Sequence, residues 1–219
     1  MRQRQLFCGD ATTGAFQFRL PAWPTDEYPL ICEEFMSKVW LITGSASGMG
    51  RSAVQTALER GDRVTATARE LDRLSDLADE FPDSLKLFRL DVTDEAAARQ
   101  AVNLTTKTFG RLDVLLNSAG YAHVSPFEQT SSEDFRAEIE ANFYGVVNLT
   151  RSALPVMRLQ RSGHIINISS SSARFGSPGA TAYGAAKWAV SGFTASLSKE
   201  VRSFGVKAIA IEPGSMRTN

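Results

Sequence analysis

Cysteine and histidine are scarce in this sequence, which holds two of each in 219 residues. Cys8 and Cys32 do not form a CxxC pair, and His123 and His164 do not combine with them in any usual metal-binding pattern. Neither a metal site nor a redox-active CxxC motif is therefore expected. A reducing, cytoplasmic compartment is the default expectation for such a chain.

An excess of charge of one sign and long apolar runs are also missing. The 24 basic residues balance the 24 acidic ones and are scattered along the chain, so no basic stripe indicates a nucleic-acid partner. The longest apolar runs are far shorter than the ~20 residues that a membrane span needs. A chain that is 43% hydrophobic and 22% charged is typical of a globular protein with a large core. We expect a small-molecule substrate as partner, with no nucleic acid and no membrane.

Short apolar segments alternate with amphipathic ones from residue 38 to the end of the chain. Strands are expected at residues 39–42, 63–68, 85–90, 114–116, 165–168 and 206–211. Helices are expected between them, at residues 50–60, 71–80, 94–109, 132–159 and 182–202. Because β and α elements alternate strictly, the sequence predicts an α/β fold, a Rossmann-like, doubly wound parallel sheet with helices on both faces.

Residues 1–35 do not follow this alternation, since they contain three prolines and no sustained periodicity. Several arginines and few acids before Asp26 leave a transit peptide open as one interpretation. Met36, directly before the first strand, resembles a natural start. We therefore expect an irregular extension without a function of its own at residues 1–35, and one Rossmann-like domain at residues 36–219.

A glycine-rich turn, TGSASGMG at residues 43–50, lies between the first expected strand and its helix. Glycines there let the backbone turn tightly and approach a pyrophosphate, whose charge the helix N-terminus favours. The spacing is GxxxGxG rather than the commoner GxGxxG, and a tight connection without a ligand is the alternative. The turn predicts cofactor binding by Gly44, Ser45, Ser47, Gly48, Met49 and Gly50.

The end of the second strand bears on the choice of cofactor. An acidic residue there would bind the 2′-hydroxyl of the adenosine ribose in NAD and repel the 2′-phosphate of NADP. This chain has Ala68 at that position, followed by Arg69. Arginine pairs well with phosphate, although a solvated surface arginine is the alternative. The sequence therefore favours NADP over NAD.

Tyr183 and Lys187 are four residues apart, a spacing that places a phenol and an ammonium on one face of a helix. The pKa of a free tyrosine is ~10, too high for efficient proton transfer near neutrality, and a nearby lysine cation favours the phenolate. Ser170 lies at the end of an apolar strand, thirteen residues before Tyr183, and could hold a carbonyl oxygen beside the phenol. These residues predict carbonyl reduction or alcohol oxidation with a separate hydride donor.

Five motifs appear in an order and spacing similar to those of the short-chain dehydrogenase/reductase family. They are TGxxxGxG at residues 43–50, Asn117-Ser118-Ala119-Gly120, Ser170, Tyr183-x-x-x-Lys187 and Pro213-Gly214. The resemblance extends from about Lys38 to the end, and five motifs in register are far more specific than a lone YxxxK. Tyr183 is the one tyrosine followed by lysine at the fourth position.

The resemblance implies a role for each matching residue. Tyr183 would be the general acid in reduction and the base in oxidation, and Lys187 would activate it and bind the nicotinamide ribose. Ser170 would orient the substrate oxygen, with Ser171 the likeliest misassignment. Asn142 would hold a water in a proton relay to Lys187, unless it is a helix-bending amide bonded to the backbone.

The resemblance also implies contacts to the cofactor outside the glycine-rich turn. Asp91 would meet the adenine ring, unless it is a loop aspartate that caps the following helix. Thr218 would contact the nicotinamide carboxamide. Asn117 would also tie neighbouring strands together. The remaining cofactor-binding residues implied are Ala119, Gly120, Tyr183, Lys187, Pro213 and Gly214.

The chain departs from the family at its C-terminus. It stops at Asn219, directly after the sixth strand, whereas family members usually continue to a seventh strand. We expect a truncated enzyme with six strands that forms a homodimer through the helices carrying Asn142 and Tyr183. The resemblance implies an NAD(P)-dependent oxidoreductase that interconverts a ketone or aldehyde and an alcohol. A catalytically weak nucleotide-binding or dimerisation module is the alternative.

Overall fold

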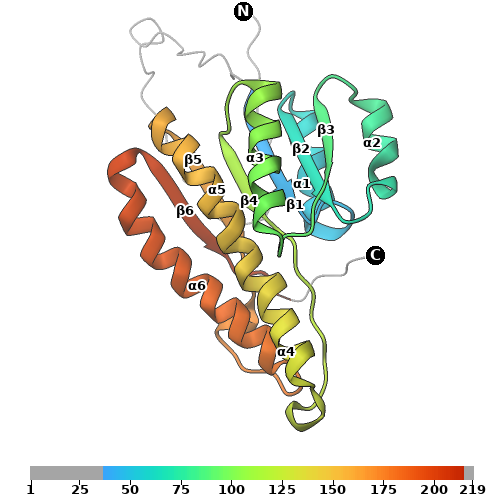
Figure 1. Ribbon diagram of the computed structural model, residues 1–219, viewed down its shortest axis with the longest axis vertical. Coiled ribbons are helices and arrows are strands. Elements are labelled where there is room, and N and C mark those ends of the chain that lie inside the picture. Colours follow the sequence, from blue (N-terminus) through green and yellow to red (C-terminus); the bar gives the residue numbers. More distant parts are fainter. Residues whose placement is uncertain (1–36, 215–219) are drawn as a thin grey trace, which may run out of the picture. The chain divides into compact units, whose positions relative to one another are not determined.

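The computed structural model describes residues 37–214, and the expectations for residues 1–35 and for Thr218 lie outside them. Within that range six strands form one parallel sheet in the order β3-β2-β1-β4-β5-β6, which confirms the predicted fold (Figure 1). The strands are β1 Val39–Thr43, β2 Arg63–Ala68, β3 Leu85–Arg89, β4 Val114–Asn117, β5 Gly163–Ile168 and β6 Val206–Ile211. The strand order reverses between β1 and β4, and ligands of such sheets bind outside the carboxyl ends at that point.

Helices cover both faces of the sheet. The helices α1 Gly48–Glu59 and α2 Ser75–Glu80 pack on one face, and α3 Glu95–Phe109, α5 Gly145–Gln160 and α6 Thr181–Val201 pack on the other. Successive residues of β1 serve the two cores, because Leu41 belongs to the α3-α5-α6 side and Ile42 to the α1-α2 side. The central strands β1 and β4 are apolar except for their last residues, Thr43 and Asn117, because helices cover both of their faces.

The long helix expected at residues 132–159 contains a local change of winding. The structure has α4 Ser132–Ile139, then a π-helical turn Glu140–Tyr144, then α5. Within the turn, Asn142 Nδ2 donates to the Glu138 carbonyl at 3.0 Å and to the Tyr121 carbonyl at 2.8 Å. The amide thus ties the turn to the segment that follows β4. Single-turn π-bulges of this kind occur frequently at functional sites.

β6 lies at an edge of the sheet, and in residues 37–214 it pairs only with β5. Its side chains alternate, with Val206 and Ala208 buried beneath α6 and Ile209 and Ile211 pointing to the other face. Ile209 is 51% exposed and Ile211 42% exposed. The part of β6 opposite α6 therefore leaves apolar surface uncovered. None of the described helices is long and apolar enough to cross a bilayer.

Candidate active site

Two adjoining clefts open at the carboxyl ends of the strands. The first has a volume of about 420 Å³ and lies between the glycine-rich turn, the end of β2 and the segment after β3. The second, of about 220 Å³, lies between the π-helical turn, the end of β5 and α6. Both are lined by Met49, Ser118, Gly120 and Tyr121, so a ligand of two linked parts can extend from one into the other.

The glycine-rich turn forms one wall of the first cleft. Gly44 has φ +68°, and a Cβ added to it would come within 2.7 Å of the Ala119 backbone. α1 begins at Gly48, and the side chain of its N-cap residue, Ser47, makes no capping hydrogen bond. The N–H groups in the first turn of a helix lack intrahelical partners and attract anions. The turn therefore fits a pyrophosphate.

Two residues predicted at this turn lie behind the cleft wall rather than on it. Ser45 is fully buried, and its Oγ donates to the Ile42 carbonyl at 2.9 Å while its N–H donates to the Thr67 carbonyl at 3.0 Å. Gly50 packs against the backbone, since an added Cβ would lie 2.3 Å from the Gly44 carbonyl oxygen. The wall itself is lined by Gly44, Ala46, Ser47, Gly48 and Met49.

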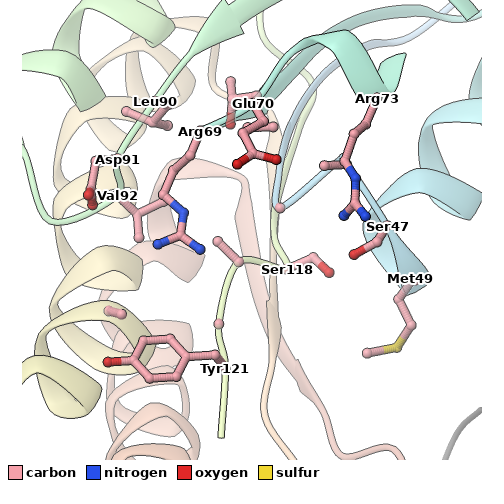
Figure 2. Close-up of a pocket in the computed structure, with 18 residues that line it drawn as sticks. Ser47, Met49, Arg69, Glu70, Arg73, Leu90, Asp91, Val92, Ser118 and Tyr121 are labelled. Atoms are coloured by element: carbon pink, nitrogen blue, oxygen red, sulfur yellow. The ribbon is translucent and has the colours of Figure 1, made fainter. Parts of the chain in front are cut away.

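Three charged side chains from the β2–α2 connection line the opposite wall. Figure 2 shows Arg69 and Arg73 pointing into the cleft on either side of Glu70. The sequence singled out Arg69 but not the other two. Glu70 could have been found from its place just after a strand whose end faces the cofactor turn, whereas the position of Arg73 depends on a contact with Arg51 that forms only in the folded chain.

Asp91 follows β3 and also lines the first cleft. Its Oδ1 accepts from the Thr93 N–H at 3.0 Å and from Thr93 Oγ1 at 2.8 Å, and these bonds lower the pKa of Asp91, with a smaller effect from Arg69. Asp94, rather than Asp91, caps α3 by accepting from the Ala97 N–H at 2.9 Å. The Asp91 carboxylate is thus held at the cleft as an anion.

The segment after β4 forms the floor between the clefts. Asn117 is buried beneath the floor and donates to Asn167 Oδ1 at 2.8 Å, which ties β4 to β5. The N–H groups of Ser118 and Ala119 donate to Thr43 Oγ1 at 3.1 Å each. Ala119 lines the first cleft, whereas Gly120 lines both. A Cβ at Gly120 would come within 2.4 Å of Asn142 Oδ1, so this position has room only for glycine.

The second cleft brings the four predicted catalytic residues together. Tyr183 and Lys187 come from the first two turns of α6, Ser170 from the end of β5, and Asn142 from the π-helical turn. Lys187 is buried, its Nζ donates to the Ile168 carbonyl at 2.9 Å, and the same Nζ lies 5.6 Å from the centroid of the Tyr183 ring. Burial lowers the pKa of Lys187 to about 8.

The carbonyl oxygen of the Asn142 side chain is buried and has no hydrogen-bond partner in the described residues. Its amide nitrogen, in contrast, makes the two backbone bonds described above. Both Asn142 Oδ1 and Lys187 Nζ lie close to the Gly120 backbone. A buried acceptor without a donor indicates that a water or ligand completes the site.

The three consecutive serines Ser169, Ser170 and Ser171 lie in different environments. Ser170 lines the second cleft, and its Oγ accepts from the Ser172 N–H at 3.1 Å, which leaves its own proton free to donate. Ser169 is buried, with its Oγ 2.9 Å from the Lys187 carbonyl and 2.8 Å from Ser191 Oγ. Ser171 does not line the cleft, and its N–H donates to the Pro213 carbonyl at 2.9 Å.

The segment after β6 closes the second cleft with Pro213 and Gly214. Glu212, which the sequence did not single out, fixes this segment. Its Oε1 accepts from Ser191 Oγ and its Oε2 from Arg174 Nε, each at 2.8 Å. The bond from Arg174 and then the bond from Ser191 lower the pKa of Glu212. No motif marks this residue, because its partners meet only in the folded chain.

Tyr121 is a further residue at the junction of the clefts that the sequence did not assign. Burial, followed by the nearby Glu138 carboxylate, raises its pKa. Glu138 is itself buried and accepts from the His123 N–H at 3.0 Å, which fixes the chain beside Tyr121. Within residues 37–214, no three metal-ligating side chains gather.

A sequence model of the short chain dehydrogenase family matches residues 38–219. The chain therefore belongs to the short-chain dehydrogenase/reductase family, as its motifs predicted. Oxidoreductase BOA17 of Botryotinia fuckeliana is 45% identical over 84% of this chain and 68% of its own length.

Solved structures agree with this assignment. The crystal structure of a short-chain dehydrogenase from Streptomyces avermitilis has a TM-score of 0.81 and 40% identity, over 84% of this chain and 68% of the other. The structure of ElxO with NADP bound has a TM-score of 0.79 and 33% identity, over 84% of this chain and 75% of the other. This chain thus spans about two thirds to three quarters of the length of these proteins.

Proposed function

We propose that this chain is an NAD(P)-dependent oxidoreductase that interconverts a carbonyl and an alcohol, with Tyr183 as the acid or base. The observation that carries the proposal is the gathering of Asn142, Ser170, Tyr183 and Lys187 around one cleft, next to the glycine-rich cleft. Membership of the family supports it. A nicotinamide dinucleotide spanning the two clefts would supply or accept the hydride.

The chain's own residues would transfer the proton and bind the substrate oxygen. In reduction, Tyr183 would donate its phenolic proton to that oxygen while Ser170 donates a hydrogen bond to it. The Lys187 ammonium, close to the Tyr183 ring, would stabilise the negative charge left on the phenolic oxygen. A pKa of about 8 lets Lys187 give up a proton near neutral pH. A water held by Asn142 Oδ1 would then return a proton from solvent.

NADP is the proposed cofactor, with NAD less favoured. Arg69 lines the first cleft, and Ala68 stands where an acid would select NAD. The similarity to ElxO, whose structure holds NADP, supports this choice. Asp91, the glycine-rich turn and the backbone from Ala119 to Gly120 would hold the adenosine and the pyrophosphate. Pro213 and Gly214 would flank the nicotinamide.

We also propose a homodimer that works in the cytoplasm. A nucleotide-binding module with weak turnover is the second candidate, favoured by the small volume of the second cleft relative to the first, about 220 against 420 Å³. The two candidates differ in chemistry and not in cofactor binding.

The test combines cofactor titration with a search for turnover. NADPH should bind at least several-fold more tightly than NADH, and Arg69→Ala should weaken NADPH alone, because a charge-assisted pair to phosphate contributes ~1.5–3 kcal/mol. NADPH should also be consumed when ketones or aldehydes are added. Equal affinities for the two cofactors would contradict the choice of NADP. Tight binding without consumption for any carbonyl would favour the binding module.

A further inference from the structure

The β2–α2 connection presents a second arginine to the first cleft. Arg73 lines the cleft together with Arg69, and in Figure 2 its guanidinium points toward Ser47 of the glycine-rich turn. Arg69 points elsewhere, since its charge influences the pKa values of Asp91, which follows β3, and of Tyr121, at the junction of the two clefts. The two guanidinium groups therefore address different parts of the same cleft.

The expected position of the adenosine ribose favours Arg73 as a phosphate contact. In this fold the pyrophosphate lies at the glycine-rich turn and the ribose 2′-oxygen near the end of β2. Arg73 points across the space between these two places, toward Ser47. A phosphate on the 2′-oxygen would thus lie between Arg69 and Arg73 rather than beside Arg69 alone.

The formal charge of the first cleft also favours a role for Arg73. Arg69, Glu70, Arg73 and Asp91 are the acidic and basic residues that line it, and their formal charges cancel. Without Arg73 the same set would carry a net negative charge and would repel a phosphate dianion. One arginine next to Glu70 is therefore a weak basis for selecting a phosphorylated cofactor.

Contacts from α1 hold Arg73 in this position. Arg51 Nη1 donates to the Arg73 carbonyl at 2.5 Å, and Arg51 also forms an ion pair with Asp76 in α2. These contacts fix the backbone of the connection against α1, directly behind the glycine-rich turn. Within the described residues the Arg73 guanidinium itself forms no ion pair. It is thus free to bind an anionic ligand.

We propose that Arg73, together with Arg69, is a specificity-determining residue for the 2′-phosphate and that Arg51 positions it. The inference rests on the proposed function, because it assumes that the first cleft binds a nicotinamide dinucleotide. It adds a residue, a second charge and a positioning contact to that site.

The test measures binding of adenosine 2′,5′-bisphosphate and of adenosine 5′-monophosphate by calorimetry, so that no hydride chemistry is needed. Arg73→Ala and, as a milder change, Arg73→Gln should lower the affinity for the bisphosphate roughly tenfold or more, as the loss of a charge-assisted contact predicts. Binding of the monophosphate should not change. Arg60→Ala, an exposed arginine at the far end of α1, is the control for net charge and should change neither.

Arg51→Ala tests the positioning role. It should lower the affinity for the bisphosphate less than Arg73→Ala does. In a chain that already carries Arg73→Ala it should have no further effect, because Arg51 acts by positioning Arg73. Additive losses in the double variant would contradict that role.

The outcomes distinguish this inference from the proposed function. If Arg69→Ala lowers the affinity for the bisphosphate and both Arg73 variants bind it normally, the inference is wrong and the choice of NADP stands. If the unmodified chain binds the two nucleotides equally, the choice of NADP is wrong, and the inference is overturned with it.

Discussion

Lys187 is the residue whose burial has the largest predicted electrostatic consequence. Its pKa falls from 10.5 to about 8 because burial penalises the ammonium. Below pH 8 both the folded and the unfolded states hold the proton, and the fold bears the full cost of the buried charge. Between pH 8 and 10.5 the unfolded state binds more protons, so the free energy of unfolding rises with pH. The expected gain from this group is roughly 3 kcal/mol.

Lys187→Met isolates that contribution. At pH 7 the variant should unfold with a higher free energy than the unmodified chain, because the buried charge is gone, and the difference should shrink as pH rises toward 10. Urea unfolding at several pH values measures it. Lys199→Met, an exposed lysine on the same helix, is the matched control and should show no such trend. A difference that stays constant with pH would contradict the assignment of a buried ammonium to Lys187.

Ser170 and Ser169 are adjacent residues with different expected effects. Ser170→Ala should lower turnover by ~10²–10³-fold, the usual loss when one donor to a developing oxyanion is removed, with little effect on stability or NADPH affinity. Ser169→Ala removes buried hydrogen bonds to Lys187 and Ser191 and should lower the free energy of unfolding by ~1–3 kcal/mol. Steady-state kinetics and urea unfolding of both variants check this. A larger loss of turnover in Ser169→Ala than in Ser170→Ala would contradict the roles assigned to the two serines.

At the scale of the elements, Glu212 holds the segment that follows β6 against α6. The carboxylate joins Ser191 on α6 to Arg174 in the loop after β5, while the backbone on either side of it accepts from Ser169 and Ser171. Its pKa is lowered by Arg174 first and Ser191 second, so it stabilises the fold above the ordinary pKa of a glutamate, and that stability is lost as pH falls through the depressed value.

Glu212→Ala should therefore lower the melting temperature at neutral pH, with a smaller loss for Glu212→Gln, which keeps an acceptor for Ser191. The difference between the unmodified chain and Glu212→Gln should disappear in acid. Thermal unfolding from pH 3 to 7 measures both effects, with Glu200→Ala, an exposed acid near the end of α6, as the control. Equal melting temperatures for Glu212→Ala and Glu200→Ala at pH 7 would show that the contact does not stabilise the fold.

The elements also show what periodicity can and cannot predict. Apolar runs and amphipathic spacing correctly predicted the six strands and the helices between them. The π-helical turn Glu140–Tyr144 was not predicted, because one widened turn barely changes the spacing of apolar residues. The helix expected at residues 71–80 is in fact a 3₁₀ turn Asp72–Leu74 followed by α2. Local hydrogen bonding decides such details, and the hydrophobic pattern does not record it.

The same limit applies to the candidate site. Residues of linear motifs, such as Tyr183 and Lys187, could be found from spacing alone. Glu212 could not, because its partners Ser191 and Arg174 come from separate segments that meet only after folding. Arg73 could not be assigned either, since its place in the cleft depends on the contact between α2 and Arg51 of α1.

For the whole molecule, exposed aromatic side chains indicate how two chains would associate. Trp188 on α6 is 60% exposed, and Tyr144, the last residue of the π-helical turn before α5, is 45% exposed. The helices α5 and α6 pack on the same face of the sheet (Figure 1). Large exposed apolar groups on neighbouring helices are typical of association surfaces. We expect a dimer through these two helices.

Light scattering should therefore give twice the mass of one chain, and Trp188→Glu should reduce it to the mass of a monomer, because the charge would be buried without a partner. Arg60→Glu on α1, which packs on the other face, should leave the dimer intact. A monomer in the unmodified chain, or a dimer that survives Trp188→Glu, would contradict this interface.

The central claim is that the Tyr183 phenol carries the proton in the reaction. Tyr183→Phe removes only the hydroxyl and leaves the ring to pack, so the fold and the affinity for NADPH should persist. Turnover should fall by about 10²–10⁴-fold, the usual contribution of a positioned acid–base group. The measurement is the turnover of Tyr183→Phe and of the unmodified chain with an activated ketone at saturating NADPH. The account predicts that loss, and near-normal turnover of the variant would contradict it.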